Sequence, residues 1–481
     1  MRPLPFGVAP RRVMVRNEMA QALPGATVMP PIGGGTQTPL GAAAAAAQRR
    51  RLADDTAAWF ARNEVHFGVS IAGEVVQRPI PYDPLPRVVD SAEWGWLERA
   101  LAQRVKALDE FIRDVYGEAR VLRAGLVPPS LVYGSAAWFR SCRGPAALRP
   151  GQVTIAGIDL VRVEGRWLVL EDNLRVPSGA SYALASRRAL ADLAPELLAD
   201  LRPRALGDYP RRLLAALQQR SPDEGLTVLL SPGPANAAYY EHCELARLMG
   251  IPVVTASDLV ASHRGVWLRR ESGNVPVARI YHRYSPEYLD PLGGRDDSLI
   301  GIPFLFAAWR QGKVVLANAP TCSVADDKRL FPYVPSLIQY YLGEQPMLEQ
   351  PPTIGLENLS RRREVLARFD DFVFKPVNGS GGKGIVFGPV ANGEERAAVS
   401  AALDEAPGTM VAQPLLEIER LPCVASAGEL EWRRCDLRAF VVVDVDPWVM
   451  PGGLTRVAPG TDQWLVNSSA GGGVKDTWVE S

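Results

Sequence analysis

The feature that most constrains this chain is a glycine-rich stretch at residues 373–388. A short apolar run ends in Lys375, four of the six residues 379–384 are glycine, and a second apolar run follows. Glycine permits positive φ and lets bare backbone N–H groups reach phosphate oxygens. The pattern predicts two strands joined by a loop that closes over a nucleotide. The expected nucleotide contacts are Lys375, Asn378, Gly379, Ser380, Gly381, Gly382, Lys383 and Gly384.

Two observations limit this interpretation. The loop leads into a strand rather than a helix, and no Ser or Thr follows Lys383, so it is not the phosphate loop of a Walker-type site. An ordinary mobile glycine hairpin without a ligand has the same local pattern. That alternative stays open from the residues alone.

A second hairpin, at residues 158–173, carries three oxygen-bearing side chains. If its loop spans residues 164–166, Asp159 lies directly opposite Glu171, and Asn173 shares their face because side chains alternate along a strand. A two-residue loop would send Glu171 to the other face. Two carboxylates and an amide oxygen suit Mg²⁺, which takes hard oxygen ligands and keeps water. We predict Asp159, Glu171 and Asn173 as metal ligands; the alternative is a solvated polar sheet edge.

The segment after this hairpin, residues 174–181, predicts a turn and the start of a helix. Backbone amides between Ser178 and Ser181 would then suit an anion or a developing oxyanion. A simple N-cap role explains Ser178 equally well.

From about residue 206 the pattern alternates between strands and helices, as in strand 227–231, helix 236–249 and strand 277–281. This predicts a βα domain with a parallel core and ligands at the carboxyl ends of its strands. Arg283 follows one such end, and we expect it to anchor a carboxylate.

Three further elements are expected around these sites. Apolar residues at helical spacing predict a long scaffold helix over residues 90–123, and another helix is expected from about 326 to 341. A short strand at 409–414 ends in Gln413 and would offer backbone hydrogen bonds to a purine edge.

The last segment of the chain supplies more cations. In the predicted strand 434–443, Asp436 and Arg438 share one face. Arg456 follows a proline–glycine turn, and Lys475 lies at the tip of a glycine-rich loop, for which terminal disorder is the alternative. We expect Arg438 and Lys475 to stabilise phosphate charge.

Composition excludes several classes of protein. A chain of 481 residues allows two to four domains. Basic and acidic residues balance at 53 each, so no overall charge favours nucleic acid or an anionic membrane. No apolar run approaches the ~18 residues of a membrane span. Five cysteines without metal-ligand spacing predict reduced thiols in a cytoplasmic protein. Residues 1–55 predict a flexible arm.

Together these stretches resemble the ATP-grasp superfamily. Residues 171–173 and 177–179 are similar to its Glu-x-Asn metal motif and the turn that follows, as in D-alanine ligase. Here they come about 200 residues before the glycine loop instead of after it. The order resembles the circularly permuted ATP-grasp family related to glutathionylspermidine synthase. The resemblance covers roughly residues 65–481 and includes residues 325–328, 450–453 and 467–469.

The resemblance implies an α/β fold, α+β in the grasp lobes, with an inserted Rossmann-like pre-ATP-grasp domain at 206–355. Residues 56–205 would form a helical scaffold with the permuted metal-binding part. Residues 356–481 would form the nucleotide-binding lobe and the remaining core strands. The implied cofactors are ATP and Mg²⁺, with Lys328 and Gln413 among the nucleotide contacts.

The function expected from this family is ATP- and Mg²⁺-dependent ligation of a carboxylate to an amine through an acyl phosphate, with small-molecule or peptide substrates. Arg438, with Arg283 or Arg456, would stabilise the acyl phosphate or anchor the acceptor. The alternatives are a nucleotide-binding regulatory module without turnover and a small-molecule kinase. A homo-oligomer stays open, and the substrates are not implied.

Overall fold

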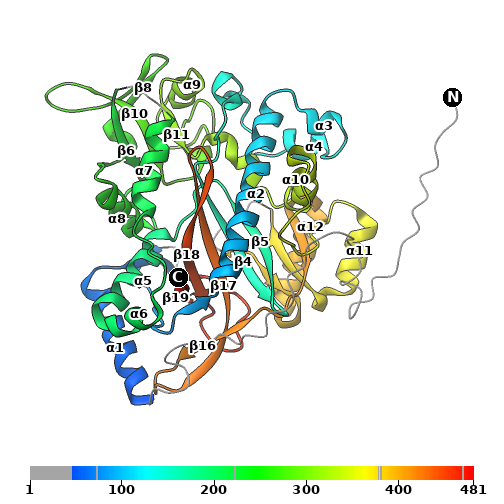
Figure 1. Ribbon diagram of the computed structural model, residues 1–481. Coiled ribbons are helices and arrows are strands. Elements are labelled where there is room, and N and C mark those ends of the chain that lie inside the picture. The colour runs from blue at the N-terminus through cyan, green and yellow to red at the C-terminus, as the bar shows by residue number, and fades with distance from the viewer. Residues whose placement is uncertain (1–45, 72–73, 221–223, 378, 380–381, 469–470) are drawn as a thin grey trace.

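The computed structural model describes residues 46–481 except 72–73, 221–223, 378, 380–381 and 469–470 (Figure 1). Its centre is a seven-stranded sheet in the order β3-β19-β18-β17-β4-β5, with β16 paired to β17. These strands are β3 (Arg87–Val89), β4 (Ile155–Val163), β5 (Arg166–Asn173), β16 (Arg420–Val424), β17 (Leu430–Val443), β18 (Pro447–Val457) and β19 (Gly473–Val479).

The two parts of this sheet come from opposite ends of the chain. Strand β4 pairs antiparallel with β17, and β3 runs parallel to β19. Figure 1 shows the green-cyan β4 and β5 beside the orange and red strands β17 and β18. The metal-motif hairpin is therefore built into a sheet in which β16 to β19 are made last, which is the arrangement that the predicted permuted ATP-grasp fold requires.

Helix α2 (Ser91–Tyr116) is the long helix that the apolar repeat predicted. The Asp90 side chain accepts hydrogen bonds from the backbone N–H groups of residues 92 and 93, at 2.8 and 3.1 Å, and so caps its start. The helix ends at Tyr116, before the predicted residue 123, because Gly117 leaves the helical conformation, with φ −105° and ψ −113°. A short separate helix, α3 (Arg120–Arg123), follows.

A second sheet lies in the predicted βα region, in the order β7-β6-β10-β9-β8 with β11 beside β10. Its β6, β7, β10 and β11 are parallel, whereas β8 and β9 are antiparallel, so the sheet is mixed. The elements are α7 (Tyr209–Gln219), β6 (Leu226–Leu230), α8 (Tyr239–Met249), β7 (Val253–Val254), β8 (Leu259–Ser262), β9 (Gly265–Leu268), β10 (Val275–His282), α9 (Leu305–Arg310) and β11 (Val315–Ala317).

A third sheet, in the order β12-β15-β13-β14, contains the glycine hairpin. Strands β13 and β14 pair antiparallel on either side of the glycines, as predicted. The sheet already begins at β12, two residues before the expected boundary at 356. Its elements are β12 (Ile354–Gly355), α11 (Leu359–Ala367), β13 (Phe372–Pro376), β14 (Val386–Phe387), α12 (Gly393–Glu405) and β15 (Met410–Pro414).

Two predicted segments differ from the structure. The helix expected from 326 begins only at α10 (Val334–Leu342), because proline at 332 and 335 is tolerated in a first turn but not inside a helix. The predicted arm 1–55 is helical from residue 46, in α1 (Ala46–Arg62), which buries Trp59 and Phe60. Residues 1–45 lie outside the described structure.

The remaining elements frame the central sheet. They are the hairpin β1 (His66–Ile71) and β2 (Glu74–Pro79), and the helices α4 (Pro129–Tyr133), α5 (Ala180–Leu193) and α6 (Pro195–Leu201). Helix α5 packs against α1, β18 and β19. No helix in the described ranges is long and apolar enough to cross a membrane.

A buried ion pair joins α2 to β5 and gives the first test. Arg104 donates to both carboxylate oxygens of Asp172 at 2.6 and 2.7 Å, with side chains 1% and 4% exposed. We expect Arg104→Met to lower the free energy of unfolding by about 3–5 kcal/mol, because the carboxylate stays buried without its cation. Lys106→Met removes an exposed ion pair of the same helix and should cost less than about 1 kcal/mol. Urea unfolding compares them, and equal losses would contradict this ranking.

Candidate active site

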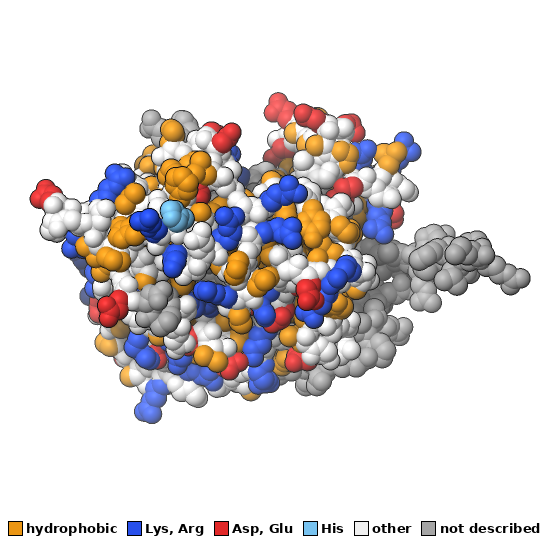
Figure 2. Space-filling view, turned by 90° about the horizontal axis from the view of Figure 1, so that it is seen from above, with side chains coloured by type: hydrophobic (Ala, Val, Ile, Leu, Met, Phe, Trp, Pro, Cys, Tyr) orange, Lys and Arg blue, Asp and Glu red, His pale blue; other side chains and the backbone are white. Residues whose placement is uncertain are grey.

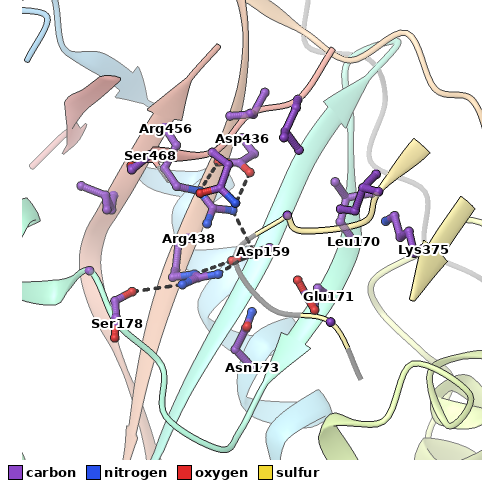
Figure 3. A pocket seen from close by; sticks show the side chains of 18 of the residues that line it. Asp159, Leu170, Glu171, Asn173, Ser178, Lys375, Asp436, Arg438, Arg456 and Ser468 are labelled. Carbon is purple, nitrogen blue, oxygen red and sulfur yellow. Dashed lines mark hydrogen bonds and ion pairs between the residues drawn. The ribbon is translucent and has the colours of Figure 1, made fainter. Parts of the chain in front are cut away.

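One cavity of about 410 Å³ lies between the central sheet and the glycine-hairpin sheet. Its wall includes residues from both chain ends and from the loop after β18 (Figure 3). Among the predicted site residues, those that line it are Asp159, Glu171, Asn173, Lys375, Gly379, Gly382, Gln413, Arg438 and Arg456. The two predicted regions thus form one pocket.

The pairing of Asp159 with Glu171 is as expected, but the reason given for it was wrong. The hairpin loop has two residues, Glu164 and Gly165, with φ of 50° and 79°, which is a tight turn with both residues left-handed. A β-bulge at Leu170 then adds one residue to β5 and restores the pairing. The bulge, which the sequence did not signal, turns Glu171 to the face of Asp159.

Asp159 is held by two arginines from β17 and β18. Arg438 donates to both of its carboxylate oxygens at 2.6 and 2.8 Å, and Arg456 donates to one at 2.8 Å (Figure 3). Burial alone would raise the pKa of Asp159, but the two guanidinium groups hold it well below its usual range. Asp159 therefore stays ionised.

Asp436 completes this group and was named only as a neighbour of Arg438 in sequence. It accepts hydrogen bonds from Arg456 at 2.8 and 2.6 Å. Arg434, two residues earlier on the same face, also lines the cavity and lies 3.6 Å from the Trp464 ring centroid. The two-residue period of the strand could have indicated that Arg434 lies on this face, whereas no sequence pattern indicated a role for Trp464.

Lys328 connects the metal motif to the glycine loop. Its Nζ lies 2.7 Å from Glu171 Oε1 and donates to the carbonyl oxygen of Gly379 at 3.0 Å. The lysine thus neutralises Glu171 and fixes one end of the loop. It was assigned to the nucleotide site from the family resemblance alone.

Lys375 and Gln413 lie side by side on neighbouring strands. Lys375 Nζ donates to Gln413 Oε1 at 2.6 Å, and Gln413 Nε2 donates to Thr353 Oγ1 at 2.8 Å. Burial lowers the pKa of Lys375 to about 8, with Glu171 opposing the shift and Lys328 adding to it. The lysine is therefore easily discharged at mildly alkaline pH.

Only part of the glycine loop lines the cavity. Gly382 lines it with a φ of 72°, and a Cβ at that position would lie 2.7 Å from Asn467 Nδ2. The loop therefore meets residues 464–468 closely. Lys383 and Gly384 are exposed and do not line the cavity. Their predicted nucleotide contacts, and those of three loop residues outside the described structure, stay predictions: Asn378, Ser380 and Gly381.

Arg283 does not line the cavity, which corrects its expected position. It is 2% exposed and pairs with Glu241 at 2.7 Å, and it donates to Ser178 Oγ at 2.6 Å. Glu241 in turn accepts from the N–H of Gly179 at 2.7 Å and of Ser181 at 3.2 Å. The amides proposed for an oxyanion are therefore already bound, and Arg283 anchors a carboxylate of the protein itself.

Lys475 was expected at a loop tip but lies inside strand β19. It is 1% exposed, forms an ion pair with Asp83 and donates to the carbonyl of Leu85 at 2.9 Å. All seven residues of the strand are buried, and three polar residues in a row, 475–477, gave no strand period by which the sequence could have signalled it. Its role is structural.

The predicted metal ligands fit Mg²⁺ by donor type. Asp159, Glu171 and Asn173 supply carboxylate and amide oxygens to one wall, and Asn173 Nδ2 is buried without a hydrogen-bond partner in the described structure. Both carboxylates already face cationic side chains, with which a metal would compete. No group of three His, Cys, Asp or Glu placed for a metal occurs among the described residues, and the predicted set contains two carboxylates and one asparagine.

Comparison with known families decides the classification. The sequence matches the family described as circularly permuted ATP-grasp type 2 over residues 86–458. The chain belongs to this family. The family predicted from the sequence motifs is thereby confirmed.

Relatives of this ATP-grasp protein are found in several bacteria. An uncharacterized protein of Mycobacterium leprae is 42% identical over 424 residues, covering 87% of this chain and 75% of that protein. One from Synechocystis is 40% identical over 420 residues, covering 86% and 87%. A putative glutamate–cysteine ligase of Frankia alni is 40% identical over 416 residues, covering 85% of this chain but 48% of that protein.

A solved structure supports the fold. A glutathione synthetase-like effector of Globodera pallida, in its apo form, superposes with a TM-score of 0.56 at 9% identity, covering 90% of this chain and 98% of that one. At this identity the likeness concerns the fold alone.

The lowered pKa of Lys375 gives a second prediction. If its ammonium group binds nucleotide phosphate, affinity for ATP should be constant at lower pH and fall as pH rises through about 8, up to tenfold per pH unit, because the free protein loses this charge. Lys375→Arg should abolish that alkaline decrease, since a guanidinium stays protonated. Calorimetric titration with ATP from pH 6.5 to 9.5 measures both, and the same pH dependence in the variant would contradict the assignment.

Proposed function

We propose that the protein is an ATP- and Mg²⁺-dependent ligase that joins a carboxylate to an amine through an acyl phosphate. One observation carries the proposal. A single cavity brings the carboxylate–amide set of β4 and β5 against the lysine and glutamine of the glycine-hairpin sheet, and the two arginines bound to Asp159 also line it.

The nucleotide would lie at the hairpin side of this cavity. Apolar side chains there offer a face for a base; they are Val373, Phe387, Leu415, Leu416 and Ile418. Lys375 and the backbone at Gly379 and Gly382 then lie along the path of the phosphates. Lys328, held against Glu171, supplies a further positive charge.

Asp159, Glu171 and Asn173 would hold Mg²⁺, which would supply positive charge to offset that of the phosphates. The protein's own contribution is positioning and electrostatics, since phosphoryl transfer needs no covalent help from it. Arg438 and Arg456 are 14% and 12% exposed on the cavity wall, so their guanidinium groups can contact a bound anion.

The reaction has two transfers. A carboxylate oxygen attacks the γ-phosphorus, and the bond to the β–γ bridging oxygen breaks to release ADP. The amine nitrogen then attacks the acyl carbon, and phosphate leaves with the loss of a proton from nitrogen. Arg438 donates hydrogen bonds to Asp159 and to the Ser178 carbonyl oxygen. It would stabilise the negative charge that develops on the phosphate oxygens.

The name of the Frankia relative is compatible with amide-bond formation. Because this chain spans about half of that protein, its activity does not transfer, and glutamate is one donor to be tested among others. Neither substrate follows from the comparison.

The decisive experiment measures ADP, inorganic phosphate and coupled product against a panel of amino acids, peptides and polyamines. A ligase releases ADP and phosphate in equal amounts with an amide product. ADP with a stable phosphorylated product would show a kinase. Nucleotide binding without stimulated ADP release would show a regulatory module and contradict the proposal.

Two substitutions test the site, and the reference is turnover of the wild type. We expect Glu171→Gln and Lys375→Ala each to lower kcat at least about 100-fold, because the first removes a carboxylate that would hold Mg²⁺ and the second removes a cation that would contact the phosphates. Both should keep the thermal midpoint within a few degrees, since neither is an apolar core residue. Lys313→Ala, which changes an exposed residue distant in sequence from both site residues, serves as the control. Full activity in either site variant would show that the site is elsewhere.

A further inference from the structure

The cavity has a second apolar region besides the one at the glycine-hairpin side. Its members come from the β1–β2 hairpin, helix α5, the loop before α8 and strand β18; they are Phe67, Ile80, Tyr182, Ala237, Ala238 and Leu454. We call these six residues the α5 pocket. The proposed function does not use it, because the base and phosphates are assigned to the other side.

The α5 pocket adjoins Arg438. Leu454 is the cross-strand partner of Arg438 in the central sheet. A Cβ at Gly179 would lie 3.0 Å from Leu454 Cδ2 and 3.9 Å from Arg438 Cδ, and Tyr182 follows Gly179 by one helical turn. In Figure 3, Ser178 and Lys375 lie on opposite sides of the Asp159–Arg438 pair, so this end of the cavity is the one away from the lysine.

The walls of the α5 pocket are fixed before any substrate binds. The Tyr182 hydroxyl donates to the His66 carbonyl at 2.9 Å, which uses the polar atom of this side chain and leaves the ring as a wall. The Phe67 ring packs edge-on against it, with centroids 5.9 Å apart. The Gly68 N–H donates to the Ala237 carbonyl at 2.7 Å, so the hairpin and the loop before α8 are joined backbone to backbone.

Phe67 and Ile80 also precede the residues matched by the family, which begin at 86. The pocket therefore combines common core elements, such as Leu454, with an addition from the N-terminal side. A wall of this kind is suited to select among substrates rather than to perform the shared chemistry.

We infer that the carboxylate substrate carries an apolar group next to its carboxylate, as in an apolar amino acid or a peptide that ends in one, and that this group occupies the α5 pocket while the carboxylate faces Arg438. The inference rests on the proposed function, which it makes more specific. A guanidinium beside the pocket pairs with a carboxylate and repels an ammonium group, so the pocket fits the acid and not the amine.

The test uses hydroxylamine in place of the unknown amine. Hydroxylamine attacks an acyl phosphate to give a hydroxamate and phosphate, so every acid that is activated can be measured. The acids are glycine, alanine, valine, leucine and phenylalanine, each free and at the C-terminus of a glycyl dipeptide. We expect kcat/KM to rise about fourfold for each buried methylene, with leucine and phenylalanine highest.

Two variants change the pocket in opposite directions. Phe67→Ala should reduce the leucine-to-glycine ratio of kcat/KM about 10-fold or more, because an apolar wall is lost. Ala237→Leu should fill the space and move the preference to alanine or glycine. Val75→Ala, an exposed position of the same hairpin, should leave the ratio unchanged.

Calorimetric titration of the same acids, with a non-hydrolysable ATP analogue and Mg²⁺ present, separates this inference from the proposed function. Affinity that rises with side-chain size supports the α5 pocket, even if no acid stimulates ADP release. A lack of stimulated ADP release would overturn only the ligase proposal. The inference about the α5 pocket would be overturned by turnover in which kcat/KM does not change across the series of acids, or in which acids with charged side chains are preferred. Turnover that depends on the size of the amine alone would overturn it too. Unchanged ratios in both pocket variants would do so as well.

Discussion

The site depends on the pairing of Asp159 with Arg438 and Arg456, which ties hairpin β4–β5 to strands β17 and β18. Two partly buried cations and two buried anions cancel in this group once Asp436 is included, so none of the four charges is left uncompensated in the sheet. Because the carboxylate and the guanidinium groups hold one another, this wall of the cavity is organised before a ligand arrives. The same pairing means that a bound metal would compete with arginines for Asp159.

Much of the architecture followed from local patterns. Helix α2, the glycine hairpin and the strands of the βα region have strong periodicity and clear turn residues, and each was found near its predicted range, except that α2 ends seven residues early. The permuted order followed from motif positions along the chain. Local rules failed where a contact distant in sequence determines the structure. Helix α1 begins inside the expected arm because Trp59 and Phe60 are buried in the core. Strand β19 is buried because it pairs with β18 and with β3, which is remote in sequence.

The site residues divide in the same way. Asp159 and Arg438 project from regular strands at a two-residue period and line the cavity as expected, whereas Glu171 lines it only because of the bulge at Leu170. Arg283 and Lys475 do not line the cavity, contrary to the prediction. A charged residue at a strand end is equally suited to bind a ligand or a buried partner within the protein, and here the positions of Glu241 and Asp83 determine the second outcome. The bulge at Leu170 shows a further limit, because one inserted residue changes the face of every later side chain and no residue type announces it.

The sheet that holds the site also determines when the site is formed. Arg438 follows Asp159 by 279 residues, so at ordinary ribosomal speeds the hairpin β4–β5 exists for roughly 14–56 s before its neighbour β17 has been synthesised. During that interval the outer edge of β4 has no strand beside it, and its acidic residue has no arginine. An unsatisfied edge of this kind invites pairing with other chains, and a charged side chain on it discourages such pairing. Asp159 is a charged residue on that edge, and is therefore of the type that discourages such pairing while the rest of the sheet is still to be made.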